Sequence, residues 1–392
     1  MGRYFTSVGK IKMNINKFFS KKSKWFIFLF FLVFIIGNSR VRCEIRAKIA
    51  RWYNNCSAAI SLTHDHGQPA SKLNRKINKF VVDNGLTMDY EIVTGNYIRF
   101  PVRRKHLLHK LTASGLRFYG HGHTHINHDK LSYNEALKSF KQCYKTMKDL
   151  GLKPIAYAYP HGAGMEKETR QALSEAGFLS GRLHFSKRST DPYIVPGSTL
   201  EPEDWFALPT IVMQDFAFSQ CKKCVNNNEE LIPYLDNAIQ KRAWIILAYH
   251  SIGNEKGYGF FKFEEFKKNI HSIRERDFWN ASMNNVTLYI RERSRAKVKI
   301  EPVWNPIKKI QTIRITLSDG LPDEIYDQPL TILFNLPGSW INKSIALVEN
   351  GNVQKTLVFD SINAMISIKP DEIKKELVVV NEIRKSANRK QQ

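Results

Sequence analysis

The stretch Phe118-Tyr119-Gly120-His121-Gly122-His123-Thr124-His125-Ile126-Asn127-His128 places four histidines within eight positions. Neutral imidazole is a common protein ligand for zinc and related metals. Histidines that alternate with Gly and Thr cannot all be core residues of one regular element. The stretch therefore predicts a metal site, and the alternative interpretation is a solvated polar loop.

The composition predicts two folded domains. The chain has 392 residues, 43% of them hydrophobic, and a formal charge of +24 from 60 Lys and Arg against 36 Asp and Glu. Domains usually hold roughly 100 to 200 residues, and a large positive charge can indicate an anionic partner. However, residues 1–39 hold seven basic groups and no acidic one, and neither an RNA-recognition motif nor a zinc-finger spacing is present. We therefore predict no nucleic-acid partner.

An apolar run, WFIFLFFLVFII at residues 25–36, follows three lysines near the N-terminus. It suits the core of a signal peptide and is shorter than the roughly 18 residues that a membrane-spanning helix needs. Positive charge also follows the run, so an uncleaved membrane anchor through residues 25–36 is the alternative. Either way we predict an exported protein, secreted, periplasmic or membrane-anchored, with this leader at residues 1–39 and a linker at 40–57.

The five cysteines are few and odd in number, which does not fit a disulfide scaffold. Cys221-Lys222-Lys223-Cys224 is a single CxxC pair. Without a second pair it is a weak zinc signal, and a local disulfide or two free thiols is the preferred interpretation.

Strand-like and helix-like segments alternate from residue 58 to residue 296. The predicted strands lie at 58–63, 89–93, 116–119, 155–159 and 244–249, and the predicted helices at 70–83, 132–151, 165–176, 229–242, 263–276 and 286–293. Strands that alternate with helices imply parallel pairing, and polar residues at successive strand ends are typical of a barrel with its site at that edge. The pattern predicts an α/β fold, a distorted (β/α) barrel.

The pattern changes after about residue 297. Short alternating apolar runs are separated by Asp-Gly, Pro-Gly and Asn-Gly turns, which predicts a small β-sandwich domain at residues 297–383. A basic polar tail follows at residues 384–392.

Polar residues at the predicted strand ends form a coherent set. The set comprises His64-Asp65-His66, His121 with His125, Tyr159-Pro160-His161-Gly162, and Asp204-Trp205 with His250. Two histidines at i and i+4 in a tight turn can face one metal, and a third ligand leaves the open position that a catalytic metal requires. A carboxylate and a separate histidine are the base and acid that hydrolysis of an amide or ester needs.

At these residues the chain resembles the NodB-type polysaccharide deacetylases, metal-dependent enzymes that remove N- or O-acetyl groups from glycans. The resemblance runs through about Ala58–Arg293 and implies a catalytic barrel domain at residues 58–296. Four motifs carry it. The family's T-F-D-D-G motif corresponds to Thr63-His64-Asp65-His66-Gly67, and its H-x-x-x-H motif corresponds to His121-Gly122-His123-Thr124-His125. Its R-x-P-Y-G motif corresponds to Ala158-Tyr159-Pro160-His161-Gly162, and its late strand-end histidine to His250.

The resemblance implies a role for each matched residue. It makes Asp65 the general base, His250 the general acid, and His66, His121 and His125 the ligands of a divalent metal, zinc first, with Co²⁺ or others as alternatives. Substrate and oxyanion contacts would come from Tyr159, Pro160, His161, Gly162, Asp204 and Trp205, with the backbone N–H of His161 facing the oxyanion. The implied partner is an acetylated polysaccharide similar to chitin, peptidoglycan or poly-N-acetylglucosamine.

Three residues depart from the family pattern. His66 stands where the family has an acidic ligand, which removes one negative charge from the site. Ala158 stands where many members have an arginine that orients the base, and His161 replaces an aromatic residue.

Each of these interpretations has a simpler alternative. His123 and His128 fall out of phase with the pair and are predicted to support the loop or face solvent, and His64 is predicted to be a core residue. Asp204-Trp205 could be only a turn. For the whole protein, one alternative is a catalytically weakened, glycan-binding pseudoenzyme of the same fold, against which Asp65 argues because the base survives. Another is a metal-dependent amidase on a non-sugar amide.

Overall fold

The computed structural model describes residues 45–65, 69–184, 191–194, 201–215, 224–305 and 310–380. The apolar run at 25–36, His66 and the basic tail at 384–392 lie outside these ranges. None of the helices within the described ranges has the length and apolar character needed to cross a membrane. The elements discussed below belong to one compact unit that begins at Arg46.

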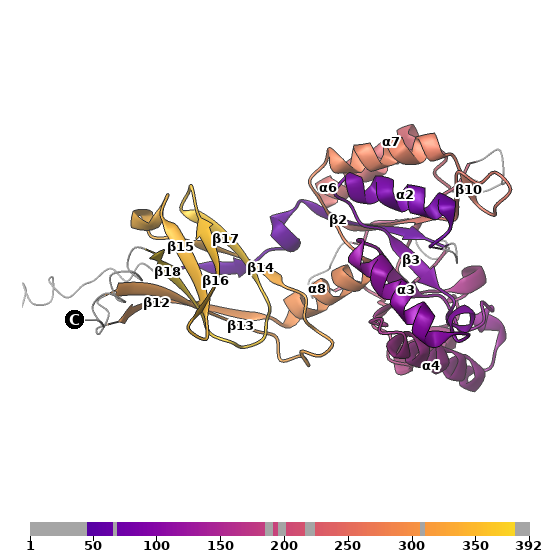
Figure 1. Cartoon of the computed structure of the whole chain (residues 1–392), viewed down its shortest axis with the longest axis horizontal. Coiled ribbons are helices and arrows are strands. Elements are labelled where there is room, and N and C mark those ends of the chain that lie inside the picture. Colours follow the sequence, from indigo (N-terminus) through magenta and orange to yellow (C-terminus); the bar gives the residue numbers. More distant parts are fainter. Residues whose placement is uncertain are drawn as a thin grey trace, which may run out of the picture. The chain divides into compact units, whose positions relative to one another are not determined.

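A curled sheet of eight parallel strands forms the centre of the first domain, as far as the described ranges show (Figure 1). The strand order is β6-β5-β4-β3-β2-β8-β7, and β11 pairs with β2 beside this path. The strands are β2 (Ala58–His64), β3 (Asp89–Ile92), β4 (Arg117–Gly120), β5 (Ala156–Ala158), β6 (Ser180–Arg182), β7 (Ile211–Met213), β8 (Trp244–Tyr249) and β11 (Phe278–Asn280). All their pairings are parallel, which confirms the predicted distorted (β/α) barrel.

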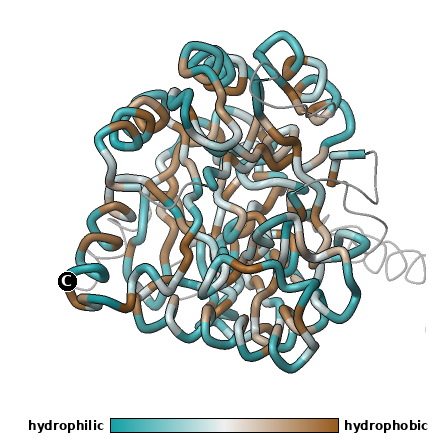
Figure 2. Tube along the Cα trace, turned by 90° about the vertical axis from the view of Figure 1, so that its right-hand side faces the viewer, coloured by the Kyte–Doolittle hydropathy of each residue, from teal (hydrophilic) through white to brown (hydrophobic). Residues whose placement is uncertain are grey.

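Helices follow these strands along the chain. They are α2 (Lys72–Asp83), α3 (Pro101–Ala113), α4 (Tyr133–Asp149), α5 (Lys167–Glu175), α6 (Asn228–Lys241), α7 (Phe263–Arg274) and α8 (Met283–Arg295). All of these described helices except α3 are amphipathic. Apolar side chains of α2, α6 and α7 share one buried cluster with alternate residues of β2, β3 and β8. In Figure 2 the helices show hydrophobic and hydrophilic residues on different sides of their turns, which is the pattern of a helix that covers a sheet.

Alternation along the strands separates two faces of the sheet. In β8, Ile245 and Leu247 belong to the cluster under the helices, whereas Trp244 and Ile246 belong to a second cluster that includes residues of α8. Successive side chains of a strand point to opposite faces. The second cluster therefore marks the inner face of the barrel, and the polar residues at the strand ends are sorted by the same alternation.

The C-terminal region is all β, as predicted. Its strands are β12 (Lys297–Asn305), β13 (Ile310–Ser318), β14 (Leu330–Asn335), β15 (Ser344–Glu349), β16 (Asn352–Val358), β17 (Asn363–Ile368) and β18 (Lys375–Val379). Five of them form the sheet β12-β13-β18-β15-β16. In the other sheet, β14 pairs with β17 and with β1 (Ala47–Ile49), which comes from the segment assigned to a linker in the sequence analysis. The packing of the two sheets into a sandwich stays a prediction.

Several elements were not predicted. Helix α3 buries only Leu108 in 13 residues, so its sequence shows little helical periodicity. The strands β6, β7 and β11 have three residues each. The paired strands β9 (Ser251–Ile252) and β10 (Phe260–Phe261) have two residues each. Segments this short carry too few residues for a period to be recognised, unless a longer apolar run extends past them as at residues 155–159 around β5.

Candidate active site

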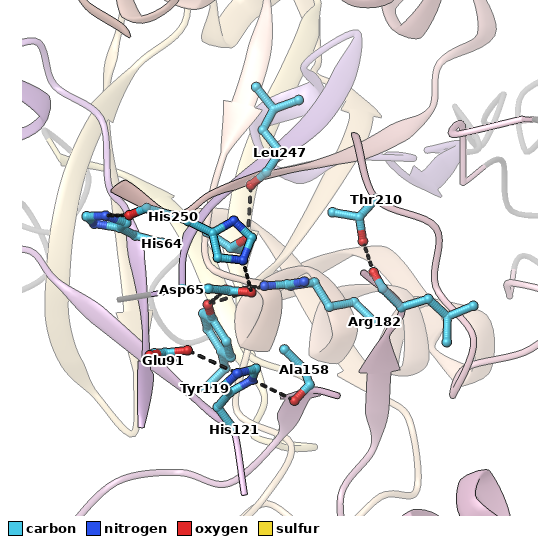
Figure 3. Close-up of polar contacts among 12 residues, drawn as sticks. His64, Asp65, Glu91, Tyr119, His121, Ala158, Arg182, Thr210, Leu247 and His250 are labelled. Carbon is cyan, nitrogen blue, oxygen red and sulfur yellow. Dashed lines mark hydrogen bonds and ion pairs between the residues drawn. The ribbon is translucent and has the colours of Figure 1, made fainter. Parts of the chain in front are cut away.

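Side chains from five different strands or strand ends meet at the carboxyl edge of the sheet (Figure 3). They are Asp65 after β2, Glu91 in β3, His121 after β4, Arg182 at the end of β6 and His250 after β8. Strand alternation explains their common direction. Tyr90 and Ile92 pack under the helices, so Glu91 between them faces inward, and Tyr119 of the inner cluster directs His121 the same way.

Asp65 lies at the centre of this group. Its backbone N–H donates to the carbonyl oxygen of Tyr249 at 2.8 Å, which continues the β2–β8 pairing past the strand end. Its Oδ1 accepts hydrogen bonds from Arg182 Nη2 and the Tyr119 hydroxyl, and its Oδ2 faces His250 Nε2 at 3.8 Å. The side chains of Asp65 and Arg182 are 5% and 1% exposed. Because an isolated buried carboxylate is costly, Arg182 is the group that makes an ionised Asp65 tolerable here.

Opposing effects set the pKa values of this cluster. Burial alone would raise the pKa of Asp65, but Arg182 first, and then His121 and His250, hold it below the usual range of an aspartate. Burial and the Asp65 charge raise the pKa of Tyr119, so its hydroxyl stays protonated and donates. Asp65 is therefore an ionised carboxylate at neutral pH and can accept a proton.

His121 is held as a neutral imidazole. Its Nδ1 lies 2.9 Å from the carbonyl oxygen of Ala158, and its Nε2 lies 3.1 Å from Glu91 Oε2. Burial lowers the pKa of His121 to about 3, although Asp65 opposes this effect. Since only a neutral imidazole has a lone pair for a metal, His121 is in the form that a ligand needs.

The described donors fit a divalent metal ion. One nitrogen or oxygen atom from each of Asp65, Glu91 and His121 lies within 4.8 Å of the others, and the same holds for Asp65, His184 and His250. Burial and then Asp65 raise the pKa of Glu91 well above its ordinary value. Mixed imidazole and carboxylate donors suit zinc and neighbouring transition metals.

The remaining predicted ligands are less fully placed. His66 lies outside the described residues. His125 is exposed, and its ring centroid is 4.9 Å from that of His121 and 4.5 Å from that of His161. The structure therefore brings His121 and His125 side by side, while their joint binding of a metal stays a prediction.

The turn at residues 160–162 lies beside the histidine loop. Nε2 of His161 contacts the carbonyl oxygen of His125 at 3.0 Å, and the backbone of His161 is left-handed, with φ of 55°. Tyr159 behaves differently from its predicted role. Its side chain is buried in the cluster with α4 and α5 and donates to the carbonyl oxygen of Phe206 at 3.1 Å, so it does not line the site.

Asp204 and Trp205 lie in a turn, and their contact with a substrate stays a prediction. Asp204 Oδ2 pairs with Arg170 Nε at 3.0 Å, and its Oδ1 accepts a hydrogen bond from the backbone N–H of Phe206 at 2.8 Å. Trp205 is buried, with the Arg291 guanidinium 4.3 Å from its ring centroid. None of the contacts described for the pair reaches His250.

Four site residues were missed by sequence reasoning: Glu91, Tyr119, Arg182 and His184. His184 lies edge-to-face against His250 with ring centroids 5.0 Å apart, and burial, followed by His250, lowers its pKa to about 3. Glu91 could have been noticed as an acidic residue inside a buried strand. Arg182 gave no such signal, because its strand of three residues, Ser-Gly-Arg, was not predicted.

Residues 53–180 match the family described as polysaccharide deacetylase. This match confirms, for that part of the chain, the resemblance predicted from the motifs. No curated protein sequence matches the chain.

Solved structures of the same kind are similar to it at low identity. A putative polysaccharide deacetylase from Mycobacterium smegmatis has 15% identity and a TM-score of 0.46 over 62% of this chain and 93% of that one. A probable polysaccharide deacetylase from Pseudomonas aeruginosa PAO1 has 14% identity and a TM-score of 0.44 over 61% and 92%. A pseudoenzyme of carbohydrate esterase family 4, in a mutant form with restored activity, has 12% identity and a TM-score of 0.38 over 58% and 67%.

Proposed function

We propose that this protein is a metal-dependent hydrolase that removes N- or O-acetyl groups from a polysaccharide. One observation carries the proposal: Asp65 is a buried carboxylate kept ionised by Arg182, and it lies between neutral metal-type donors and a histidine. This observation favours an enzyme over the pseudoenzyme alternative, because a copy that has lost catalysis does not need an ionised carboxylate beside the metal-type donors.

The described residues can divide the proton transfers of hydrolysis between them. Arg182 and Tyr119 both contact Oδ1 of Asp65, so Oδ2 is the oxygen available to a water. Asp65 accepts a proton as the oxygen of that water attacks the acetyl carbonyl carbon. The C–N or C–O bond of the acetyl group then breaks, His250 donates a proton to the leaving amine or alcohol, and acetate is released.

Two further groups stabilise charge in this scheme. The backbone N–H of His161 is proposed as the donor to the oxyanion, from a turn that lies beside the histidine loop. A divalent metal, proposed to be zinc and held by His121 with His125, His66 or the carboxylates nearby, supplies Lewis-acid polarisation of the carbonyl when bound.

Acetate release tests this function directly. Purified protein should release acetate from at least one of chitin oligomers, peptidoglycan, poly-N-acetylglucosamine or acetylated xylan, and a chelator should stop the reaction until zinc or cobalt is restored. Asp65→Asn keeps the shape of the side chain but cannot take the proton, so we expect kcat to fall by roughly 100-fold or more. Asp89→Asn is the control, since Asp89 is also buried in this sheet but accepts a hydrogen bond from the backbone N–H of Met283 at 2.7 Å.

Two results would count against the proposal. Near-normal turnover by Asp65→Asn on a glycan that the wild type deacetylates would show that Asp65 is not the general base. Acetate release from small non-sugar amides but from no glycan would favour the amidase alternative instead.

Export completes the proposal. It rests on the apolar run at residues 25–36 and its basic flank, and it is supported by Cys224, which is in a disulfide, because disulfides persist mainly in oxidising compartments. Fractionation of expressing cells should find the folded domain outside the cytoplasm. A folded cytoplasmic pool that retains Met1–Ile36 would contradict it.

A further inference from the structure

Two buried acceptor atoms face each other in the site. Nδ1 of His121 lies 2.9 Å from the carbonyl oxygen of Ala158, and only a donor can approach a carbonyl oxygen in this way. This contact assigns the proton of the neutral ring to Nδ1 and leaves the lone pair on Nε2. That lone pair lies 3.1 Å from Oε2 of Glu91, which is also an acceptor when the carboxylate is ionised. A cation, either a proton or a metal ion, must lie between them.

The separation suits two donors to one metal ion. Zinc binds imidazole nitrogen at about 2.0–2.1 Å and carboxylate oxygen at about 2.0–2.2 Å, so two atoms 3.1 Å apart can share it. Both side chains are held in the interior, where His121 and Glu91 are 5% and 8% exposed. The backbone supports this arrangement, since the N–H of His121 donates to the carbonyl oxygen of Ile92 at 3.0 Å, next to Glu91 in β3.

The charge of the predicted site points to the same residue. The resemblance implies an acidic ligand at position 66, where this chain has histidine, so the predicted set of three histidines lacks one negative charge. Glu91 is a buried carboxylate on β3, the neighbour of the strand that leads to position 66. It lies in the same donor group as Asp65 and His121.

We propose that Glu91 is a ligand of the metal ion, bound together with His121, and that it supplies the carboxylate that position 66 lacks. The proposal rests on the proposed function for the use of the metal, but it concerns binding alone and can be tested without a substrate.

Metal affinity is the first measurement. Apo-protein prepared with a chelator is titrated with zinc in competition with a chromophoric chelator, for the wild type, Glu91→Gln, Glu91→Asp and the control Asp89→Asn. Loss of a group that only hydrogen-bonds to a metal ligand costs roughly 10- to 100-fold in affinity. We expect one zinc per wild-type chain, a loss of more than 100-fold in Glu91→Gln, a smaller loss in Glu91→Asp, and wild-type affinity in Asp89→Asn.

If a proton rather than a metal ion lies between Glu91 and His121, the zinc titration has a different outcome. The amide of Glu91→Gln can donate an N–H to Nε2 of His121, so this variant would keep the contact and bind zinc within 100-fold of the wild type. That result would overturn the proposal, and so would the absence of zinc binding by the wild type.

A second measurement uses the wild-type protein, so it does not depend on whether a variant folds. Infrared difference spectra, zinc-loaded minus apo, of wild-type protein carrying ¹³C-carboxylate glutamate should show a shifted glutamate carboxylate band. The absence of such a band would overturn direct ligation by Glu91. Zinc binding that depends on Glu91, without acetate release from any glycan, would instead uphold this proposal and reject the proposed function.

Discussion

At the scale of single residues, an arginine lies beside the proposed base, Asp65, but it comes from a different strand than the resemblance implies. The resemblance places an orienting arginine at position 158, where this chain has alanine. Ala158 is buried and offers only its carbonyl oxygen, to His121. The guanidinium that contacts Asp65 comes from Arg182 on β6, which pairs with β5 so that Arg182 stands directly opposite Ala158. A charge one strand away can therefore replace the missing side chain.

The first residue-scale prediction concerns this arginine. Arg182→Ala should lower kcat by roughly 100-fold, with less effect on KM, because burial would then raise the pKa of Asp65 and neutralise the base. Millimolar guanidinium should restore part of kcat by occupying the space left by the side chain, and urea, which is similar in shape but neutral, should not. Turnover of Arg182→Ala within a few-fold of the wild type would show that Asp65 does not depend on this partner.

The second residue-scale prediction concerns stability. Removing one partner of a buried ion pair usually costs about 3–5 kcal/mol, because the other charge stays buried. Arg182→Ala should therefore lower the free energy of unfolding by about this amount at pH 7. Arg182→Ala combined with Asp65→Asn should lose less than the sum of the two single variants, as measured by denaturant unfolding. Additive losses would mean that the two side chains do not interact.

At the scale of elements, the sequence predicts the parts whose pattern extends over several turns or residues. The capping box at Ser132 and Glu135 forms as expected at the start of α4, and β8 has the predicted bounds. As a result, Asp65, His121 and His250, which follow predicted strands, could be assigned to the site. Arg182 lies on β6, whose three residues have no period, and Glu91 lies within β3 rather than at its end. These contacts depend on the register between strands, which no local pattern encodes.

An element-scale prediction follows from the close approach of β4 to its neighbours. A Cβ on Gly120 would lie 2.9 Å from Cδ2 of Tyr157 and 3.0 Å from Cε1 of Phe178. Overpacking of this kind typically costs about 1–3 kcal/mol, so Gly120→Ala should be destabilised to that extent and should displace the adjacent His121, lowering zinc affinity. Gly338→Ala is the control, because a Cβ there meets no atom within 4 Å. An unchanged melting temperature in Gly120→Ala would contradict the packing described here.

At the scale of the whole molecule, the barrel domain is joined to the C-terminal β region at both of its ends. Strand β1, which precedes the barrel in sequence, pairs with β14, and α8, its last helix, contacts the segment before that strand. The backbone N–H of Gln328 donates to Glu292 Oε1 of α8 at 3.0 Å. Pairing between residues almost 300 positions apart has no signature in a single sequence, which is why β1 was assigned to a linker.

The last prediction uses the pKa of Glu292 as a probe of this junction. Burial is the main cause that raises its pKa, to about 9, so the folded chain keeps a proton on Glu292 that the unfolded chain loses at about pH 4.3. The native state therefore binds more protons than the unfolded state between these two pH values, and this residue makes stability fall as pH rises through that window.

Glu292→Gln imitates the protonated acid and can still accept the Gln328 hydrogen bond. It should match the wild type at pH 4 and exceed it by on the order of 2–5 kcal/mol at pH 9, measured by denaturant unfolding of metal-free protein. Glu264→Gln, at an exposed position of α7, should show no such difference. An advantage of Glu292→Gln that is the same at both pH values would mean that Glu292 is ionised in the folded protein, and that the C-terminal region does not bury it.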